Sequence, residues 1–197
     1  MSTAGPSALG RVFTARRSFF SFLGPEFRFF GADGQLVLFV KQKAFRLKEE
    51  ITAYRDEGKS QPVLRIQARS IMDVRGTYDV SDANTGERVG TCKRQGLKSL
   101  LRDTWELRGV DDMLVGTLSE DSLALALVRR FLLKAWLPQT FSLTAPDGRP
   151  LGTLKQRFNP FVIVYDCDFG GGGADAVDTR LATAATVLLL AIEGRQG

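Results

Sequence analysis

Apolar and polar residues alternate in short runs along most of the chain, and small turn-forming residues separate these runs. Alternation of this kind is typical of strands in a sheet with one buried face. With an opening run near residues 12–22, the pattern predicts about twelve strands. Such regular spacing of short strands favours an all-β sandwich or barrel.

One pattern occurs three times: an aromatic strand, a glycine turn, and a strand that ends in lysine. The repeated positions are Gly34 with Lys41, Gly86 with Lys93, and Gly148 with Lys155. The separation from glycine to lysine is seven residues in each case. Because Asp-Gly and Thr-Gly supply the positive φ of a tight turn, each unit predicts a β-hairpin. A second hairpin follows each of the first two units. The third continues into residues 160–165, which alternate little, as a strand buried on both faces would.

Two stretches have helical rather than strand periodicity. Residues 121–136 carry apolar residues at helical spacing, with Ser119 as a candidate cap and Pro138 just beyond the end. Residues 176–193 are apolar nearly all round. A helix lying on a sheet would show a polar stripe, so this segment requires protein on every side. We expect a closed antiparallel barrel of twelve strands around this C-terminal helix, which fills its lumen.

The length of 197 residues is rather short for two domains. We expect residues 1–23 to form an N-terminal tail and first-strand region, and residues 24–197 to form one barrel domain. The tail carries three arginines and no acidic residue, so an organelle-targeting peptide is the alternative. The uncharged stretch 181–192 is shorter than the roughly 20 residues that span a bilayer.

The amino-acid composition excludes several kinds of catalytic and metal site. The chain has no histidine, which excludes Ser-His-Asp and Cys-His catalysis and histidine metal sites. Cys92 and Cys167 lie in apolar runs without a CxxC spacing, so we expect buried free thiols in a reducing, cytoplasmic compartment. The net charge of +5 is mild, and we expect no nucleic-acid partner.

The end of the chain resembles the Tubby C-terminal-like superfamily, which includes LURP-one-related proteins and phospholipid scramblases. The resemblance rests on Phe158-Asn159-Pro160, on the run from Tyr165 to Gly170, and on Asp178 before the apolar helix, together with the order of the repeated units. It covers residues 24–193 and implies a twelve-stranded barrel around a hydrophobic C-terminal helix. The cysteine-rich cluster and proline-rich leader of animal scramblases do not occur in this chain.

Resemblance to Tubby implies that basic strand residues bind phosphoinositide-type headgroups by charge-assisted hydrogen bonds to phosphate. The candidates are Lys41, Lys43, Lys93, Arg94, Lys155 and Arg157. The alternative is that these cations mark solvated strand ends and keep edges from pairing. A contiguous basic patch joining the three repeated lysines would favour lipid binding, whereas scattered cations would count against it.

Four carboxylates near the C-terminus form a candidate calcium site, since oxygen-rich clusters suit this ion. They are Asp166, Asp168, Asp175 and Asp178. Resemblance to scramblases implies a calcium-binding loop in this region. The alternative is that these residues solvate a strand end and cap a helix, because no EF-hand spacing is present.

Taken together, these features predict a non-catalytic, monomeric barrel that binds anionic phospholipid headgroups as a peripheral membrane protein. No cofactor is expected, with calcium as the one candidate. The alternatives are a protein-interaction scaffold and a calcium-responsive scramblase-like protein.

Overall fold

A computed structural model describes residues 10–18, 24–42, 50–70, 76–95, 104–121, 138–159, 161–171 and 174–193. Beyond Asp121, the helix predicted over 121–136 lies outside these residues, as does the candidate Lys43. The opening strand predicted near 12–22 is present as a strand that ends at Ser18.

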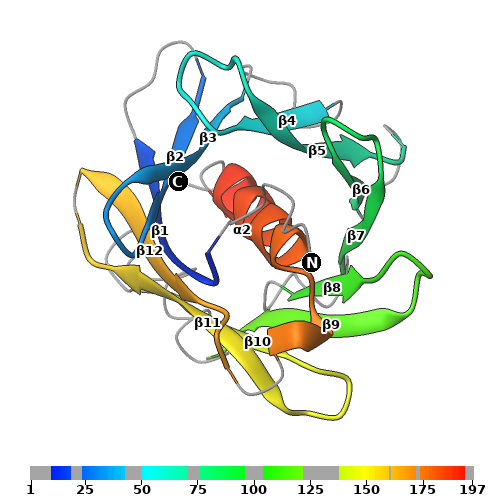
Figure 1. The fold of residues 1–197 in the computed structure, drawn as a ribbon. Helices are drawn as coiled ribbons and strands as arrows, with labels where there is room; N and C mark the ends of the chain where they lie inside the picture. The colour runs from blue at the N-terminus through cyan, green and yellow to red at the C-terminus, as the bar shows by residue number, and fades with distance from the viewer. Residues whose placement is uncertain are drawn as a thin grey trace, which may run out of the picture.

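The described residues form twelve antiparallel strands closed into one barrel, which confirms the predicted fold (Figure 1). Each strand pairs with its neighbours in sequence, and β1 closes the barrel by pairing with β12. The strands are β1 (Val12–Ser18), β2 (Glu26–Gly31), β3 (Leu36–Lys41), β4 (Glu50–Tyr54), β5 (Pro62–Ala68), β6 (Thr77–Asp82), β7 (Arg88–Arg94), β8 (Thr104–Arg108), β9 (Leu114–Glu120), β10 (Thr140–Thr144), β11 (Pro150–Arg157) and β12 (Val162–Asp168).

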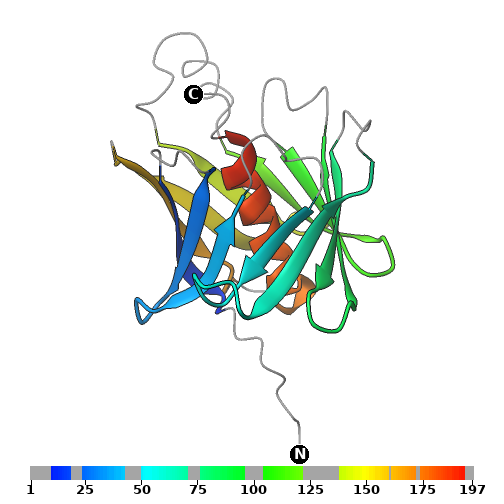
Figure 2. The same cartoon turned by 90° about the horizontal axis from the view of Figure 1, so that it is seen from above.

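Tight hairpin turns gather at one end of the barrel (Figure 2). The predicted turn glycines Gly34, Gly86 and Gly148 have φ of 76°, 73° and 86°, as turns of this type require. The register shifts by one residue just before each of these three turns. Such bulges increase the local twist and help the sheet to curve into a closed barrel.

Helix α2 (Thr179–Glu193) runs through the barrel, with its C-terminus at the end opposite the hairpin turns (Figures 1 and 2). Asp178 caps it by accepting a hydrogen bond from the Arg180 amide at 2.8 Å. Every residue from Leu181 to Ala191 is buried. The predicted internal helix is therefore confirmed, and the barrel core is formed by the inner faces of the strands packing on α2.

Inward and outward residues alternate along the strands, as the pleat requires. Cys92 and Cys167 are among the inward residues, and both are free thiols buried in the core, as expected. Strand β12 overlaps the segment 160–165 predicted to be buried on both faces, and it is buried on both faces at Val164 and Tyr165. Tyr165 points inward and is fully buried, while Val164 on the outer face is only 6% exposed.

The barrel has an approximate threefold repeat. The repeated hairpins β2–β3, β6–β7 and β10–β11 start four strands apart in the closed order of twelve. In each repeated hairpin, the residue two positions before the lysine points outward. It is Phe39 in the first unit, Thr91 in the second and Thr153 in the third. These three positions are structurally equivalent, so differences between their surroundings show how the three sides of the barrel have diverged.

Candidate functional site

The repeated lysines do not form one patch. Lys41 lies on β3, Lys93 on β7 and Lys155 on β11, and each pair is separated by four strands around the closed barrel. The three side chains therefore face three different sides of the molecule. This scattered arrangement is the one that counts against a shared lipid site made by all three lysines.

Each repeated lysine lies across from a carboxylate on a neighbouring strand. Lys41 pairs with Glu26 at 3.0 Å. This contact is the main reason that the pKa of Glu26 lies below its ordinary value, with Arg28 adding to the effect. In the second and third units the register places Lys93 opposite Glu106 and Lys155 opposite Asp166. Among the described residues, only Lys41 forms an ion pair with the carboxylate opposite it. What the three positions share is an opposite carboxylate in the register, not a ligand.

Arg94 differs from the other cationic candidates because it lies on the inner face of the barrel. Its partner in the β7–β8 register is Trp105, whose side chain is buried in the core. Lys93, one residue earlier, lies on the outer face. The two adjacent cations predicted to act together therefore point to opposite sides of the sheet.

The four candidate calcium ligands have separate roles. Asp166 and Asp168 lie on β12 rather than in a loop, and Asp166 pairs with Arg157 at 2.8 Å. Asp175 pairs with Arg11 at 2.7 Å, and Asp178 caps α2. Within the described residues, no group of three or more acidic or cysteine side chains is placed to hold a metal ion. Ion pairing accounts for Asp166 and Asp175, and helix capping accounts for Asp178. Asp168 accepts a hydrogen bond from the Gly170 amide and has no cation partner in the described part of the chain.

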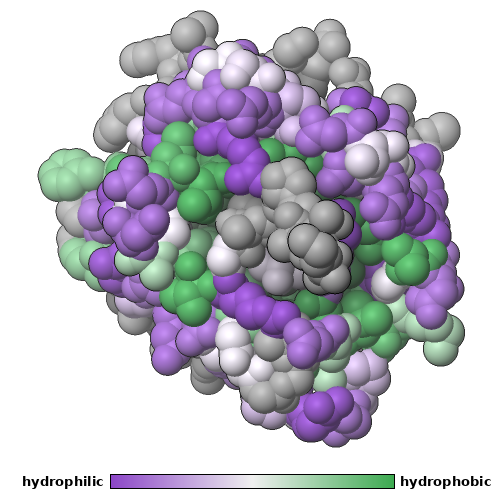
Figure 3. Space-filling model, viewed as in Figure 1, coloured by the Kyte–Doolittle hydropathy of each residue, from purple (hydrophilic) through white to green (hydrophobic). Residues whose placement is uncertain are grey.

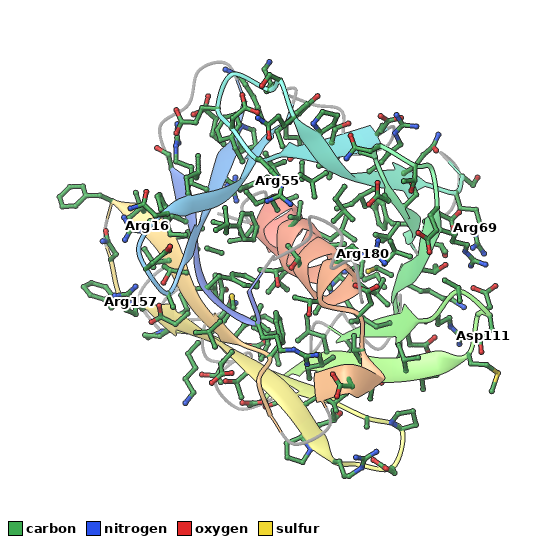
Figure 4. All side chains as sticks on the ribbon, in the orientation of Figure 1. Arg16, Arg55, Arg69, Asp111, Arg157 and Arg180 are labelled. Carbon is green, nitrogen blue, oxygen red and sulfur yellow. The ribbon has the colours of Figure 1, made fainter. Side chains whose placement is uncertain are left out.

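Four of the predicted candidates, Lys155, Arg157, Asp166 and Asp168, come together on the outer face of β11 and β12, and Arg16 on β1 joins them there. Arg16 and Arg157 are both opposite Val164 in the register, one on each side of it. We call these two arginines the arginine row. Neighbouring strands are about 4.8 Å apart, so their backbones lie roughly 10 Å from each other. Figure 4 shows both side chains on the same side of the barrel, opposite Arg69 and Asp111.

Contacts on this face hold the arginine row in place. The Arg16 guanidinium lies 4.7 Å from the centre of the Phe30 ring, and Arg157 is held by Asp166. Cation–π contact orients a guanidinium without neutralising it. Arg16 makes no ion pair within the described part of the chain. Its full charge is therefore available to an external anion.

A groove of about 580 Å³ lies on the same face. It extends from Arg16 of the arginine row towards the hairpin turns. We call it the outer groove. Its charged lining residues are Arg16, Lys155, Asp166 and Asp168. Thr14 and Thr153 contribute hydroxyls, and Val12 and Phe30 contribute apolar surface. The outer groove thus combines two cations and two carboxylates in one concave site.

At the other end of β11 and β12, the connection between these two strands exposes two aromatic side chains. Phe158 is 56% exposed and Phe161 is 72% exposed. The Asn159 side chain accepts hydrogen bonds from the Phe161 and Val162 amides at 2.9 and 3.1 Å, which fixes this turn. We call the two phenylalanines the aromatic tip. Hydrophobic groups project at the left edge of Figure 3, where β11 and β12 lie in Figure 1.

Sequence reasoning missed the aromatic tip and Arg16. A signal for the tip was present, since Asn159-Pro160 between two phenylalanines is a turn sequence, and turns lie on the surface. Arg16 gave no such signal. Its place beside Arg157 depends on how β1 closes the barrel against β12, which is a contact between the two ends of the chain.

The closed antiparallel barrel around a C-terminal helix is the architecture of Tubby-like proteins, which confirms the resemblance seen in the sequence. A family model described as LURP-one-related matches residues 36–189, and the chain belongs to this family, within the Tubby C-terminal-like superfamily. None of the curated proteins compared with the chain matches it. Among the described residues, no helix has the length and apolar character needed to cross a membrane.

Proposed function

We propose that this Tubby-like barrel is a non-catalytic module that binds anionic phospholipid headgroups at a membrane surface. The proposal places the contact on one side of the barrel, at the aromatic tip and the arginine row. It does not use the three repeated lysines as a set. The single observation that carries it is the pair of exposed phenylalanines at the β11–β12 connection with two cations close by, Lys155 on β11 and Arg16 on β1, the strand next to β12. Neither cation makes an ion pair within the described residues.

The spacing along the strand suits a bilayer surface. Arg157 directly precedes Phe158, and Lys155 lies three residues before it, or roughly 10 Å at the rise of an extended strand. Aromatic side chains insert at the boundary between headgroups and acyl chains, where basic residues contact the phosphates. With the aromatic tip inserted, the arginine row and Lys155 would lie at headgroup depth.

Co-sedimentation with vesicles tests the proposal. We expect binding to phosphatidylcholine vesicles that contain phosphatidylglycerol or a phosphoinositide, weaker binding as salt screens the charges, and little binding to phosphatidylcholine alone. The double variant Phe158→Ser/Phe161→Ser should weaken binding about thirtyfold, for a loss of about 1 kcal/mol per half-buried ring. Arg16→Gln should weaken it about fivefold, for about 1 kcal/mol per cation.

Matched controls lie elsewhere on the barrel. Val110 and Met113 are an exposed apolar pair on the β8–β9 turn, 59% and 65% exposed. Arg65 lies on β5, six strands from β11. The variants Val110→Ser/Met113→Ser and Arg65→Gln should bind as the unmodified protein does. No pelleting with anionic vesicles at low salt, or equal losses in the control variants, would overturn the proposal.

A further inference from the structure

The threefold repeat allows one position to be compared on three sides of the same barrel. In the first unit, the outward residue Phe39 is only 3% exposed. The Arg28 guanidinium lies 5.2 Å from the centre of its ring, and Arg28 is itself held by Glu26 and Glu57 at 2.9 and 2.6 Å. The outer face of this unit is therefore closed by an aromatic ring and an arginine.

In the second unit, the equivalent residue Thr91 is 1% exposed. Arg69 and Arg88 donate to its hydroxyl oxygen at 3.3 and 3.0 Å, and the hydroxyl donates to Asp79 at 3.1 Å. Arg88 also pairs with Asp112 at 2.7 Å. Two arginines and their carboxylate partners thus cover the outer face of this unit.

In the third unit, the equivalent residue Thr153 is half-buried and lines the outer groove. The position of Arg88 is occupied here by Pro150, which cannot reach over the threonine. Within the described residues, the Thr153 hydroxyl has no hydrogen bond. The surface that protein side chains cover in the other two units is open in this one, which is the difference expected where a ligand takes their place.

In the outer groove, the cations that make no ion pair and the carboxylate of Asp168 lie at different positions along the strands. Lys155 and Arg16 lie on the side towards the aromatic tip, and neither makes an ion pair within the described residues. Asp168 lies opposite Thr153, two residues further towards the hairpin turns than Asp166. It accepts a hydrogen bond from the Gly170 amide at 2.8 Å but pairs with no cation in the described part of the chain. Two unpaired cations thus face one unpaired carboxylate across the groove.

We propose that the outer groove binds a group that carries both a phosphate and an ammonium, as aminophospholipid headgroups and soluble aminophosphates do. Arg16 and Lys155 would bind the phosphate by charge-assisted hydrogen bonds. Asp168 would bind the ammonium, and Thr153 would add a hydroxyl contact. For its lipid source this inference rests on the proposed function, but the groove can be tested without a membrane.

Titration calorimetry with soluble probes is the direct test. O-phosphoethanolamine should bind at least tenfold more tightly than inorganic phosphate or ethanolamine alone. Asp168→Asn should remove this preference while leaving phosphate binding in place, and Thr153→Arg, which restores an arginine over the groove, should abolish binding of all three. Asp147→Asn, on an exposed turn, is the matched control. Circular dichroism would verify that each variant is folded.

An experiment with vesicles distinguishes this inference from the proposed function. Phosphatidylserine carries an ammonium and a carboxylate that phosphatidylglycerol lacks, and both lipids have the same net charge. The unmodified protein should therefore prefer phosphatidylserine through the ammonium, and Asp168→Asn should not. Equal binding of both lipids, still lost in the aromatic-tip variant, would overturn this inference and leave the proposed function standing. Equal affinity for phosphate and O-phosphoethanolamine, or an unchanged preference in Asp168→Asn, would also overturn it.

Discussion

Arg17 on β1 donates a hydrogen bond from Nη1 to the backbone carbonyl of Leu190, at 3.0 Å, in the last turn of α2. Its guanidinium also lies 5.8 Å from the centre of the Phe27 ring on the inner face of β2. Carbonyls at the end of a helix lack intrahelical partners and carry partial negative charge. One inward arginine therefore fastens the C-terminal end of the central helix to the barrel wall.

Replacing Arg17 with methionine should lower the free energy of unfolding by about 2 kcal/mol, because a hydrogen bond from a charged donor to a helix C-terminus is lost. Urea denaturation followed by circular dichroism measures the change. Arg16→Gln on the same strand is the control, since that side chain faces outward and loses only an exposed cation–π contact with Phe30, which should lower the midpoint much less. Equal midpoints for the two variants would contradict the role assigned to Arg17.

Gly90 on β7 packs against the backbone of β8 and against Leu181 of the central helix. A Cβ at this position would clash with the Arg108 carbonyl oxygen and lie 3.1 Å from Leu181 Cδ2. We expect Gly90→Ala to destabilise the protein by about 3 kcal/mol, as overpacking of a core does. Gly86→Ala, at a turn with φ of 73° and no atom within 4 Å of the new Cβ, should cost about 1 kcal/mol. Denaturation midpoints in the reverse order would contradict the close packing of Gly90 against Arg108 and Leu181.

Ionisation of Asp79 makes the stability of the barrel depend on pH in the acidic range. Hydrogen bonds from Arg69 lower the pKa of Asp79 despite its partial burial, and Thr91 and Arg88 add to this effect. Because the folded-state pKa lies below the unfolded-state value of about 3.9, the stabilisation is present above that pH and is lost as the pH falls below it.

The variants Asp79→Asn and Arg69→Gln should therefore be less stable than the unmodified protein at pH 7, and the difference should shrink as the pH falls towards 3. Thermal unfolding at a series of pH values measures it. Glu26 and Glu106, whose pKa values are also lowered, will keep part of the pH dependence in both variants. A constant difference between pH 7 and pH 3 would contradict the assignment.

The fold could be predicted from the sequence because its two strongest signals are local. A repeated glycine–lysine spacing predicts hairpins, and a helix without a polar stripe around Leu188 and Leu189 requires burial on every side. Both predictions are confirmed by the closed barrel and its central helix. Closure also explains why the repeated lysines lie apart, since equivalent positions in three four-strand units must face three directions.

The candidate site could be predicted only in part. Lys155, Arg157, Asp166 and Asp168 were singled out from the sequence, but in two separate sets with different ligands. The register between β11 and β12 brings them onto one face, and the closing pair β1–β12 adds Arg16. A shift of one residue in either register would turn these side chains inward. The β11–β12 register is set by a short connection, but β1 and β12 lie at opposite ends of the chain, and local sequence does not determine the register between them.

The central claim is that the aromatic tip enters a membrane, and a fluorescent label at Phe161 tests it most directly. Cys92 and Cys167 are buried, and burial raises the pKa of both thiols, so a cysteine introduced at the surface can be labelled selectively. We predict that an environment-sensitive dye on Phe161→Cys shifts to the blue and brightens with anionic vesicles, and that high salt reverses the change. The same dye on Met113→Cys should not respond. An unchanged spectrum at position 161, or the same shift at both positions, would contradict the account.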